Sequence, residues 1–194
     1  MYRYFKRFLD IVLSAAGLLV LSPILLVIAV AIKLDSKGPV LFKQKRVAKG
    51  KEHFQILKFR TMYADVPKDV PTHLLADPES KITKIGRFLR KSSLDELPQI
   101  FNIFKGEMSI IGPRPALWKQ FDLIAERDKY GANDVRPGLT GLAQVMGRDE
   151  LPIEVKAKYD GEYAKNVTFA NDVKIFFKTI TSVLGAKGVK EGKQ

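Results

Sequence analysis

The chain has 194 residues, which is long enough for one compact domain and short for two that fold independently. It contains no cysteine, which excludes disulfides, cysteine-ligated zinc and thiol nucleophiles. The two histidines, His53 and His73, give little material for a histidine-centred site. The net charge of +12 favours polyanionic partners, such as phosphates, anionic lipid headgroups or nucleic acid, without choosing among them. The chemistry must therefore come from carboxylates and cations.

An uncharged apolar run of 22 residues, Ile11 to Ile32, follows a short basic segment. Its length is about that needed to cross the hydrocarbon core of a membrane as one helix. The run is longer than the core of a cleavable signal peptide and has no small-x-small cleavage site, so we expect it to stay on the protein. Basic residues flank it on both sides: Arg3, Lys6 and Arg7 before it, and Lys33, Lys37, Lys43, Lys45 and Arg46 after it.

Ser22-Pro23 lies in the middle of this run. A proline inside a helix removes one hydrogen bond and bends the helix, which permits a hairpin that enters and leaves through one leaflet. Because cationic flanks favour the cytoplasmic side, the two basic ends favour the hairpin slightly. An ordinary spanning helix with a tolerated proline remains the alternative on the residues alone.

Two segments with alternating or clustered apolar and basic residues come next, at Val40 to Lys45 and Phe54 to Met62. Gly50 lies between them, so the pattern predicts extended strands around a turn. The following stretch, Ala64 to Ser80, contains three prolines and three aspartates and is typical of a surface loop.

A short basic amphipathic helix is predicted after this loop. Ile82, Ile85, Phe88 and Leu89 fall at helical spacing, and lysines and arginines occupy the other face. Such a helix is suited to lie along an anionic membrane surface.

The densest candidate for chemistry is the sequence SSLDELPQ, Ser92 to Gln99. A helix that begins near Asp95 places Pro98 in its first turn, where proline is tolerated, and leaves two adjacent carboxylates at the helix N-terminus. A carboxylate held there can attack an electrophile or bind a metal. The alternative is plain capping, in which Ser93 and Glu96 form a capping box and Asp95 improves the helix dipole.

Beyond this helix, Met108 to Ile111 predict a short strand, followed by a Gly-Pro-Arg-Pro turn that restricts where Arg114 points. Near the end, Asn171-Asp172 are predicted to cap a helix with an apolar stripe. Six cations, several beside glycine or proline, are candidates to hold a diphosphate: Lys58, Arg60, Arg90, Arg114, Arg136 and Arg148.

The sequence resembles the bacterial sugar transferase family of monotopic phosphoglycosyl transferases over nearly its whole length. The motifs that carry the resemblance are the apolar run broken at Ser22-Pro23, KFRTM, SSLDELPQ, GEMSIIGPRP and RPGLTGLAQVMGR. It implies a mixed α+β fold that is mainly helical, with a re-entrant membrane hairpin kinked at Ser22-Pro23, amphipathic interfacial helices and a small β-hairpin. We expect a membrane segment at residues 1–36 and a catalytic domain at residues 37–194.

The resemblance also implies a mechanism. Asp95 attacks the sugar-bearing phosphorus of a UDP-sugar, UMP leaves, and polyprenyl phosphate takes the phosphosugar from the aspartate. Mg²⁺, bound partly by Asp95, neutralises the diphosphate. Glu96 assists, and the phosphate-binding residues are expected to be Lys58, Arg60, Arg90, Arg114 and Arg136.

The expected partners are a UDP-sugar, polyprenyl phosphate and membrane lipids, at the cytoplasmic face of the bacterial inner membrane. Nucleic acid is not expected, because a basic scaffold anchored in the membrane leaves the acidic pair unexplained. A membrane hydrolase of nucleotide sugars or lipid diphosphates would use similar groups and is a second alternative. The identity of the sugar, the glycoconjugate pathway (such as capsule or exopolysaccharide) and the oligomeric state are not encoded in any motif.

Overall fold

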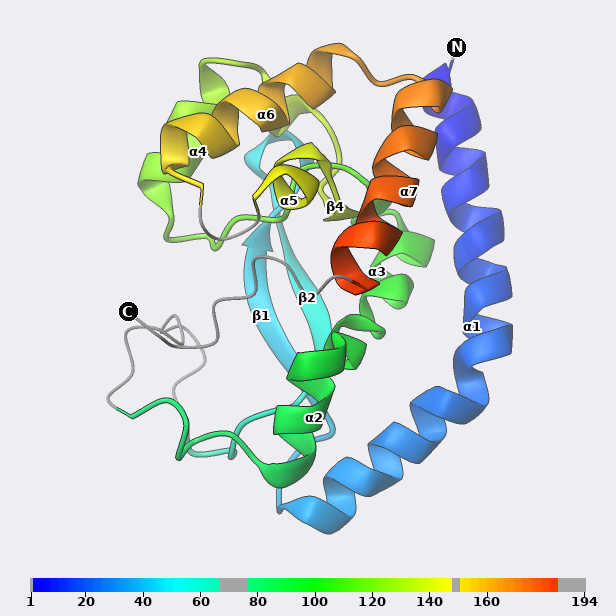
Figure 1. Ribbon diagram of the computed structural model, residues 1–194, viewed down its shortest axis with the longest axis vertical. Helices are drawn as coiled ribbons and strands as arrows, with labels where there is room; N and C mark the ends of the chain where they lie inside the picture. Colours follow the sequence, from blue (N-terminus) through cyan, green and yellow to red (C-terminus); the bar gives the residue numbers. More distant parts are fainter. Residues whose placement is uncertain (1, 67–76, 148–150, 185–194) are drawn as a thin grey trace.

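The computed structural model describes residues 2–66, 77–147 and 151–184. Its architecture is mixed and mostly helical, as predicted, with two small sheets. In Figure 1 a long N-terminal helix runs along one side of the remaining elements. In chain order these elements are α1 (Tyr2–Asp35), β1 (Leu41–Val47), η1 (Lys49–Lys51), β2 (His53–Phe59), α2 (Lys84–Ser92), η3 (Leu94–Glu96), α3 (Gln99–Lys105), β3 (Ser109–Ile111), α4 (Phe121–Asp128), η4 (Ala132–Asp134), β4 (Gly138–Thr140), α5 (Leu142–Met146), α6 (Ile153–Lys165) and α7 (Phe169–Leu184).

Strands β1 and β2 form the predicted β-hairpin. They pair antiparallel, with Phe42 opposite Lys58 and Gln44 opposite Ile56. The connecting turn needs left-handed backbone at Gly50 (φ 68°), which glycine adopts without strain, and continues into Lys51 (φ 64°). Phe54 and Ile56 are buried against Ile103 of α3, so the hairpin and α3 share one core cluster.

Helix α2 confirms the predicted amphipathic helix, except that Ile82 of the predicted stripe lies before its start and pairs with Met62. Thr83 caps it by accepting a hydrogen bond from the Gly86 amide at 2.9 Å. A side chain at Gly86 would meet the Thr61 carbonyl oxygen at 2.0 Å, so only glycine lets the helix approach the end of β2 this closely. Leu89 is buried in the core and Phe88 is exposed. Contact of this helix with a membrane stays a prediction.

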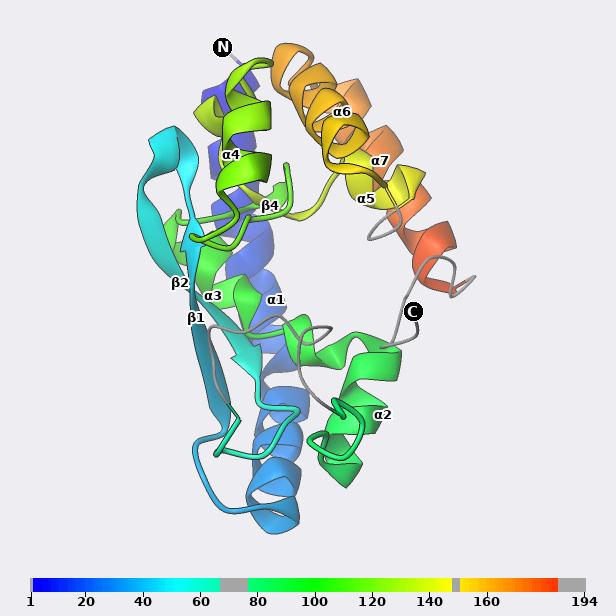
Figure 2. The same cartoon turned by 90° about the vertical axis from the view of Figure 1, so that its left-hand side faces the viewer.

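The short strands β3 and β4 pair in parallel, and β3 occupies the predicted Met108 to Ile111 segment. Figures 1 and 2 show α2 near one end of the β1–β2 hairpin, and α4, α5 and α6 gathered near the other. Helix α7 begins at Phe169, so Asn171-Asp172 lie inside it and do not cap it, contrary to the prediction. Asp172 instead accepts hydrogen bonds from three side chains, those of Tyr2, Lys6 and Tyr163.

Helix α1 is continuous over 34 residues and contains Pro23. Its ribbon changes direction along its length in Figure 1. The helix is long and apolar enough to cross a membrane, and 11% of its most apolar window is buried inside the protein. The large side chains in its middle, such as Leu19, Val20, Leu26 and Val27, are exposed. This exposure distinguishes α1 from the core helix of a soluble protein.

Both ends of α1 are attached to the rest of the protein. Near its start, Lys6 Nζ lies 2.8 Å from Asp172 Oδ2 of α7, and Arg7 donates to the carbonyls of Ile103 and Phe104 at the end of α3. Near its end, Ile28 and Ile32 pack in a buried cluster with elements β2 and α2. The N-terminal helix and residues 37 onward are therefore joined at two separate places.

Candidate active site

The acidic pair lies in a tight connection between α2 and α3. Ser93 has left-handed backbone (φ 57°) and ends α2, and the 3-10 turn η3 then carries Asp95 and Glu96. Helix α3 begins at Gln99 and not near Asp95 as predicted, so Pro98 precedes its first residue and the acidic pair lies in the 3-10 turn before it. The missing N–H of Pro98 has no helical partner there. The Ser93 side chain makes no capping hydrogen bond, so the capping box is not formed. The Glu96 carboxylate instead accepts hydrogen bonds from two cationic side chains.

Two cations hold Glu96. Lys58 Nζ, from β2, donates to Glu96 Oε1 at 2.7 Å, and Arg114 Nη2, from the Gly-Pro-Arg-Pro turn, donates to the same oxygen at 2.8 Å. Burial of the Glu96 carboxyl disfavours its charged form, but the positive charges of Arg114 and Lys58 outweigh this cost and hold its pKa well below the usual range. Glu96 is therefore ionised at neutral pH and orients both cations.

Asp95 is in a different state from its neighbour. Its Oδ2 lies 3.9 Å from Lys58 Nζ, beyond hydrogen-bond distance, and its side chain is 14% exposed. Burial raises the pKa of Asp95, and the charge of Glu96 adds to the rise; Lys58, Arg90 and Arg114 oppose it. Two adjacent carboxylates thus have pKa values displaced in opposite directions, which is typical of sites that carry acid–base or nucleophilic chemistry.

Arg90, a predicted phosphate-binding residue, comes from the last turn of α2 and faces this pair. Its Nε donates to Thr61 Oγ1 at 2.9 Å, which fixes the guanidinium beside the end of β2. Its charge lowers the pKa of Asp95. The structure therefore brings together Lys58, Arg90, Arg114, Asp95 and Glu96, which we call the carboxylate cluster.

Arg46 lies near Arg114 and Glu96. In the sequence it stands out only as one of the basic residues after the apolar run. Its Nη1 donates to the Pro115 carbonyl at 3.0 Å and its Nη2 to Gln44 Oε1 at 2.7 Å. Burial and the nearby Arg114 lower the pKa of Arg46 to about 10, and Glu96 opposes this. A signal was available, because Gln44 and Arg46 alternate along β1 on the face that Lys58 shares.

Two predicted phosphate-binding residues lie elsewhere. Arg60 is buried, and its guanidinium donates to the Pro39 carbonyl and to both the hydroxyl and the carbonyl of Ser36, which fastens the segment after α1. Arg136 donates to the Gly106 carbonyl at 3.0 Å, beyond the opposite end of α3 from Asp95.

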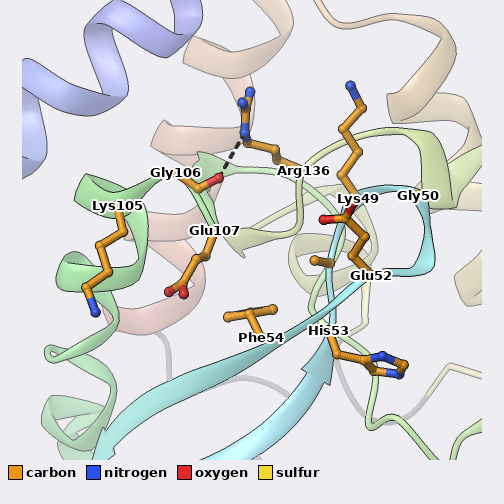
Figure 3. A pocket seen from close by; sticks show the side chains of 10 residues that line it. Lys49, Gly50, Glu52, His53, Phe54, Lys105, Gly106, Glu107 and Arg136 are labelled. Carbon is orange, nitrogen blue, oxygen red and sulfur yellow. Dashed lines mark hydrogen bonds between the residues drawn. The ribbon is translucent and has the colours of Figure 1, made fainter.

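Arg136 lines a separate hollow of about 510 Å³, together with Lys49, Glu52, His53, Lys105 and Glu107 (Figure 3). The hollow has side chains of both charges. Arg148, His73 and most of the predicted loop from Ala64 to Ser80 lie outside the described residues.

Within residues 2–66, 77–147 and 151–184, no group of three or more acidic or histidine side chains is arranged to hold a metal ion. The acidic pair supplies one carboxylate, Asp95, that is not already bonded to two cations. Mg²⁺ is commonly held by one or two carboxylates together with substrate phosphates, so this donor set fits a magnesium ion that arrives with a diphosphate.

The sequence profile of the family described as bacterial sugar transferase matches residues 1–186. The chain belongs to the bacterial sugar transferase family. It is 40% identical over 97% of its length to the UDP-N-acetylgalactosamine-undecaprenyl-phosphate N-acetylgalactosaminephosphotransferase of Aeromonas hydrophila, which it covers to 46%. It is 41% identical over 92% of its length to the UDP-glucose:undecaprenyl-phosphate glucose-1-phosphate transferase of Caulobacter vibrioides, which it covers to 69%. An uncharacterized sugar transferase of Bacillus subtilis is 38% identical and is covered to 90%.

The chain spans less than half the length of several curated relatives that it matches. Three of the relatives are named as transferases that act with undecaprenyl phosphate, and their names differ in the sugar, which is N-acetylgalactosamine, galactose or glucose. Membership of the family therefore leaves the sugar open for this chain.

Proposed function

We propose that this chain transfers a sugar 1-phosphate from a UDP-sugar to polyprenyl (undecaprenyl) phosphate, releases UMP, and so begins the synthesis of a bacterial glycoconjugate. The observation that carries the proposal is the carboxylate cluster, in which two adjacent acids lie among three cations beside a membrane-type helix. The names of the relatives supply the substrate class.

Asp95 is the better nucleophile of the pair. The Glu96 carboxylate is stabilised by two short hydrogen bonds from cations to its Oε1, so the lone pairs of that oxygen are occupied and the basicity of the carboxylate is low. Asp95 lacks such close partners among the described side chains, and its raised pKa makes its carboxylate more basic once it is ionised. We therefore assign attack to Asp95 and orientation of Lys58 and Arg114 to Glu96.

The reaction has two displacements at one phosphorus atom. A carboxylate oxygen of Asp95 forms a bond to the sugar-bearing phosphorus as the bond to the UMP oxygen breaks, leaving an aspartyl phosphosugar. An oxygen of polyprenyl phosphate then attacks the same phosphorus, and the Asp95 carboxylate leaves. Lys58, Arg90 and Arg114 balance the negative charge of the phosphates in both steps, because all three lie around Asp95.

Mg²⁺ is the expected cofactor, held by Asp95 and substrate phosphates, and it would neutralise the diphosphate and the charge that develops on UMP. Arg60 and Arg136 stay predicted phosphate ligands from sequence. Their bonds to residues 36–39 and to Gly106 favour structural roles for both.

We further propose that α1 enters the cytoplasmic leaflet of the inner membrane, bends at Ser22-Pro23 and returns. With 34 residues the helix reaches about 51 Å, more than the ~30 Å of a hydrocarbon core. Both ends are bonded to the same globular body, through Lys6 and Arg7 at one end and Asp35 at the other. A straight span would have to break one of these attachments.

This course of α1 can be tested because the chain has no native cysteine. Arg3→Cys and Lys37→Cys, both at exposed positions, are treated in intact cells with a membrane-impermeant thiol reagent. We expect neither to react until the membrane is opened. Labelling of one position alone in intact cells would mean that α1 crosses the bilayer.

The function is tested by UMP release from a panel of UDP-sugars, with Mg²⁺, in the presence and absence of undecaprenyl phosphate. One UDP-sugar should give continuous UMP release and a lipid diphosphosugar only with the lipid acceptor. Continuous release without the acceptor would indicate a hydrolase, and no release with any UDP-sugar would favour a membrane-anchored scaffold for anionic lipid or nucleic acid.

A further inference from the structure

The turn that carries Arg114 is fixed by hydrogen bonds from other segments of the chain. Pro113 and Pro115 have no N–H group, so this turn cannot be fixed by hydrogen bonds from those two nitrogens. Instead, four successive carbonyls accept hydrogen bonds from other segments. The donors are the Gly138 amide to Pro113 at 2.8 Å, Arg127 Nη2 to Arg114 at 3.0 Å, Arg46 Nη1 to Pro115 at 3.0 Å and the Val47 amide to Ala116 at 3.0 Å.

Backbone contact reinforces the start of this turn. A side chain at Gly138 would meet the Gly112 amide nitrogen at 2.1 Å, and one at Gly112 would meet the Arg136 carbonyl oxygen at 2.4 Å. The two backbones are therefore too close for any residue larger than glycine. The base of the turn is fixed by the β3–β4 pair, and its Arg114 peptide is fixed by Arg127.

Arg127 is itself part of a sealed ion pair. Its side chain is 5% exposed and that of Asp160, from α6, is 1% exposed. Arg127 Nε donates to Asp160 Oδ2 at 2.9 Å, and Nη2 donates to the same oxygen and to the Arg114 carbonyl. A buried ion pair gives little net stability over an apolar pair of similar size, so stability alone does not explain why this pair is present. The hydrogen bond from Arg127 to the Arg114 carbonyl suggests a second role for it.

We propose that the Asp160–Arg127 pair positions Arg114 for the reaction, by locking the peptide from which the Arg114 side chain reaches Glu96. Asp160 holds the Arg127 guanidinium, Arg127 holds the Arg114 carbonyl, and the Arg114 side chain donates to Glu96 Oε1 at 2.8 Å. Neither Asp160 nor Arg127 touches Asp95 or Glu96, so both are positioning residues. The effect on rate rests on the proposed function.

The competing account is that the pair only joins α4 to α6. Leu123 of α4 and Ala157 of α6 share a buried cluster, so these helices are already packed together. A purely structural pair would change stability and would leave the geometry of Arg114 unaltered. The two accounts therefore differ in whether a change at Arg127 acts through Arg114.

The test is a double-mutant cycle between Arg127→Lys and Arg114→Gln in the full-length chain, with UMP release from the UDP-sugar that the panel identifies as substrate. Arg127→Lys keeps a positive charge beside Asp160 but shortens the side chain. We expect it to lower kcat/KM about tenfold, because small misplacements of charged groups cost up to about 10²-fold. In the Arg114→Gln background the same change should cost less than about twofold. A full tenfold loss in both backgrounds would overturn the proposal.

A second readout does not depend on the reaction. The side-chain N–H signals of Arg114 are followed by NMR and assigned by their loss in Arg114→Gln. If Arg127→Lys displaces the Arg114 peptide, these signals should shift, because the hydrogen bond from Arg114 to Glu96 is altered. Unchanged Arg114 signals would overturn the proposal even if the rate falls.

Asn133→Ala is the matched control. Asn133, in η4, is buried and donates hydrogen bonds to the Ile124 carbonyl and to Asp128. Both partners belong to α4, the helix that carries Arg127, and Asn133 has no hydrogen bond to the Arg114 turn. The control variant should lower the melting temperature and leave kcat/KM and the Arg114 N–H signals unchanged. If Arg127→Lys does not fold, the paired variant Arg127→Gln/Asp160→Asn, which leaves no unpaired buried charge, takes its place. Absence of UMP release by the wild-type chain would refute the proposed function, whereas the Arg114 N–H signals would still decide the positioning role.

Discussion

The protein contains two groupings of acids with cations that look alike in composition and differ in their surroundings. The Arg127–Asp160 pair is sealed, with side chains that are 5% and 1% exposed. The carboxylate cluster is open, with exposures of 14% for Asp95, 21% for Glu96 and 40% for Arg114. In the sealed pair each charge has its partner. In the open cluster two cations bond to one acid, and the adjacent acid has no equally close partner among the described residues.

This difference separates charges that hold the structure from charges that meet a substrate. A sealed pair cannot receive a ligand without unfolding its surroundings. In the open cluster the cations lie near Asp95 without a close hydrogen bond to it, so they can exchange their present contacts for contacts with a diphosphate. The comparison predicts that changes in the open cluster mainly affect rate and that changes in the sealed pair affect stability first.

The largest expected effect is at Asp95. Asp95→Asn keeps the size of the side chain but cannot form an acyl phosphate, so we expect the rate of phosphosugar transfer to fall by on the order of 10⁴-fold or more. Steady-state UMP release measures it, and the melting temperature should stay near that of the wild type. Asp128→Asn, at an exposed acid of α4, serves as the control and should keep full activity. Near wild-type transfer by a folded Asp95→Asn protein would remove Asp95 as the nucleophile.

The sealed pair should give the largest change in stability. Asp160→Ala leaves Arg127 as an unpaired buried charge, and the free energy of unfolding should fall by about 3–5 kcal/mol. Denaturant titration in detergent measures this, with Glu96→Gln beside it as the variant from the open cluster. We expect Glu96→Gln to lower the unfolding free energy by less than half as much. Equal losses of unfolding free energy in Asp160→Ala and Glu96→Gln would contradict the difference in stability role between the sealed pair and the open cluster.

Glu96→Gln should slow transfer and at the same time shift its pH dependence. The rate should fall about 10- to 100-fold, because Lys58 and Arg114 lose the acid that orients them. The negative charge of Glu96 contributes to the raised pKa of Asp95, so its removal lowers that pKa. Activity, which needs ionised Asp95, should then persist to lower pH than in the wild type. An acid limb that moves to higher pH in the kcat/KM profile would contradict this assignment.

The smallest effect is expected at Arg136. Its exposed side chain bonds to the Gly106 carbonyl, at the opposite end of α3 from Asp95. Arg136→Ala should change kcat/KM by less than about twofold, as is usual for surface changes remote from a site. Arg114→Ala, measured in the same assay, should reduce it far more. A comparable loss in both variants would restore Arg136 to the phosphate-binding set that the sequence predicts.

The elements with a clear local pattern could be predicted from sequence. Alternation around Gly50 predicts the β-hairpin, and helical spacing around Leu89 predicts α2. SSLDELPQ indicates the acidic pair, because Pro98 restricts where the next helix can begin. These features depend on residues within a few positions of one another.

The remainder depends on contacts between distant segments. Lys58 and Glu96 are 38 residues apart, and Arg127 and Asp160 are 33 apart, so no local pattern links either pair. The same limit explains Arg60 and Arg136. Arg136 has a proline neighbour, as Arg114 does, and Arg60 lies in the KFRTM motif, but both side chains bond to partners outside the carboxylate cluster. Asp172 looks like a helix cap in sequence, and it instead binds the start of α1.

The most direct test of the central claim is intact-protein mass spectrometry after acid quenching. The full-length protein is mixed with its UDP-sugar and Mg²⁺, and the lipid acceptor is omitted. We predict an added mass of one sugar phosphate, located at Asp95 by peptide mapping, together with about one UMP released per active site. The adduct should disappear when undecaprenyl phosphate is added, and Asp95→Asn should give neither adduct nor burst. An enzyme that transfers phosphosugar at full rate but forms no adduct, and releases UMP only when both substrates are present, would contradict the covalent mechanism.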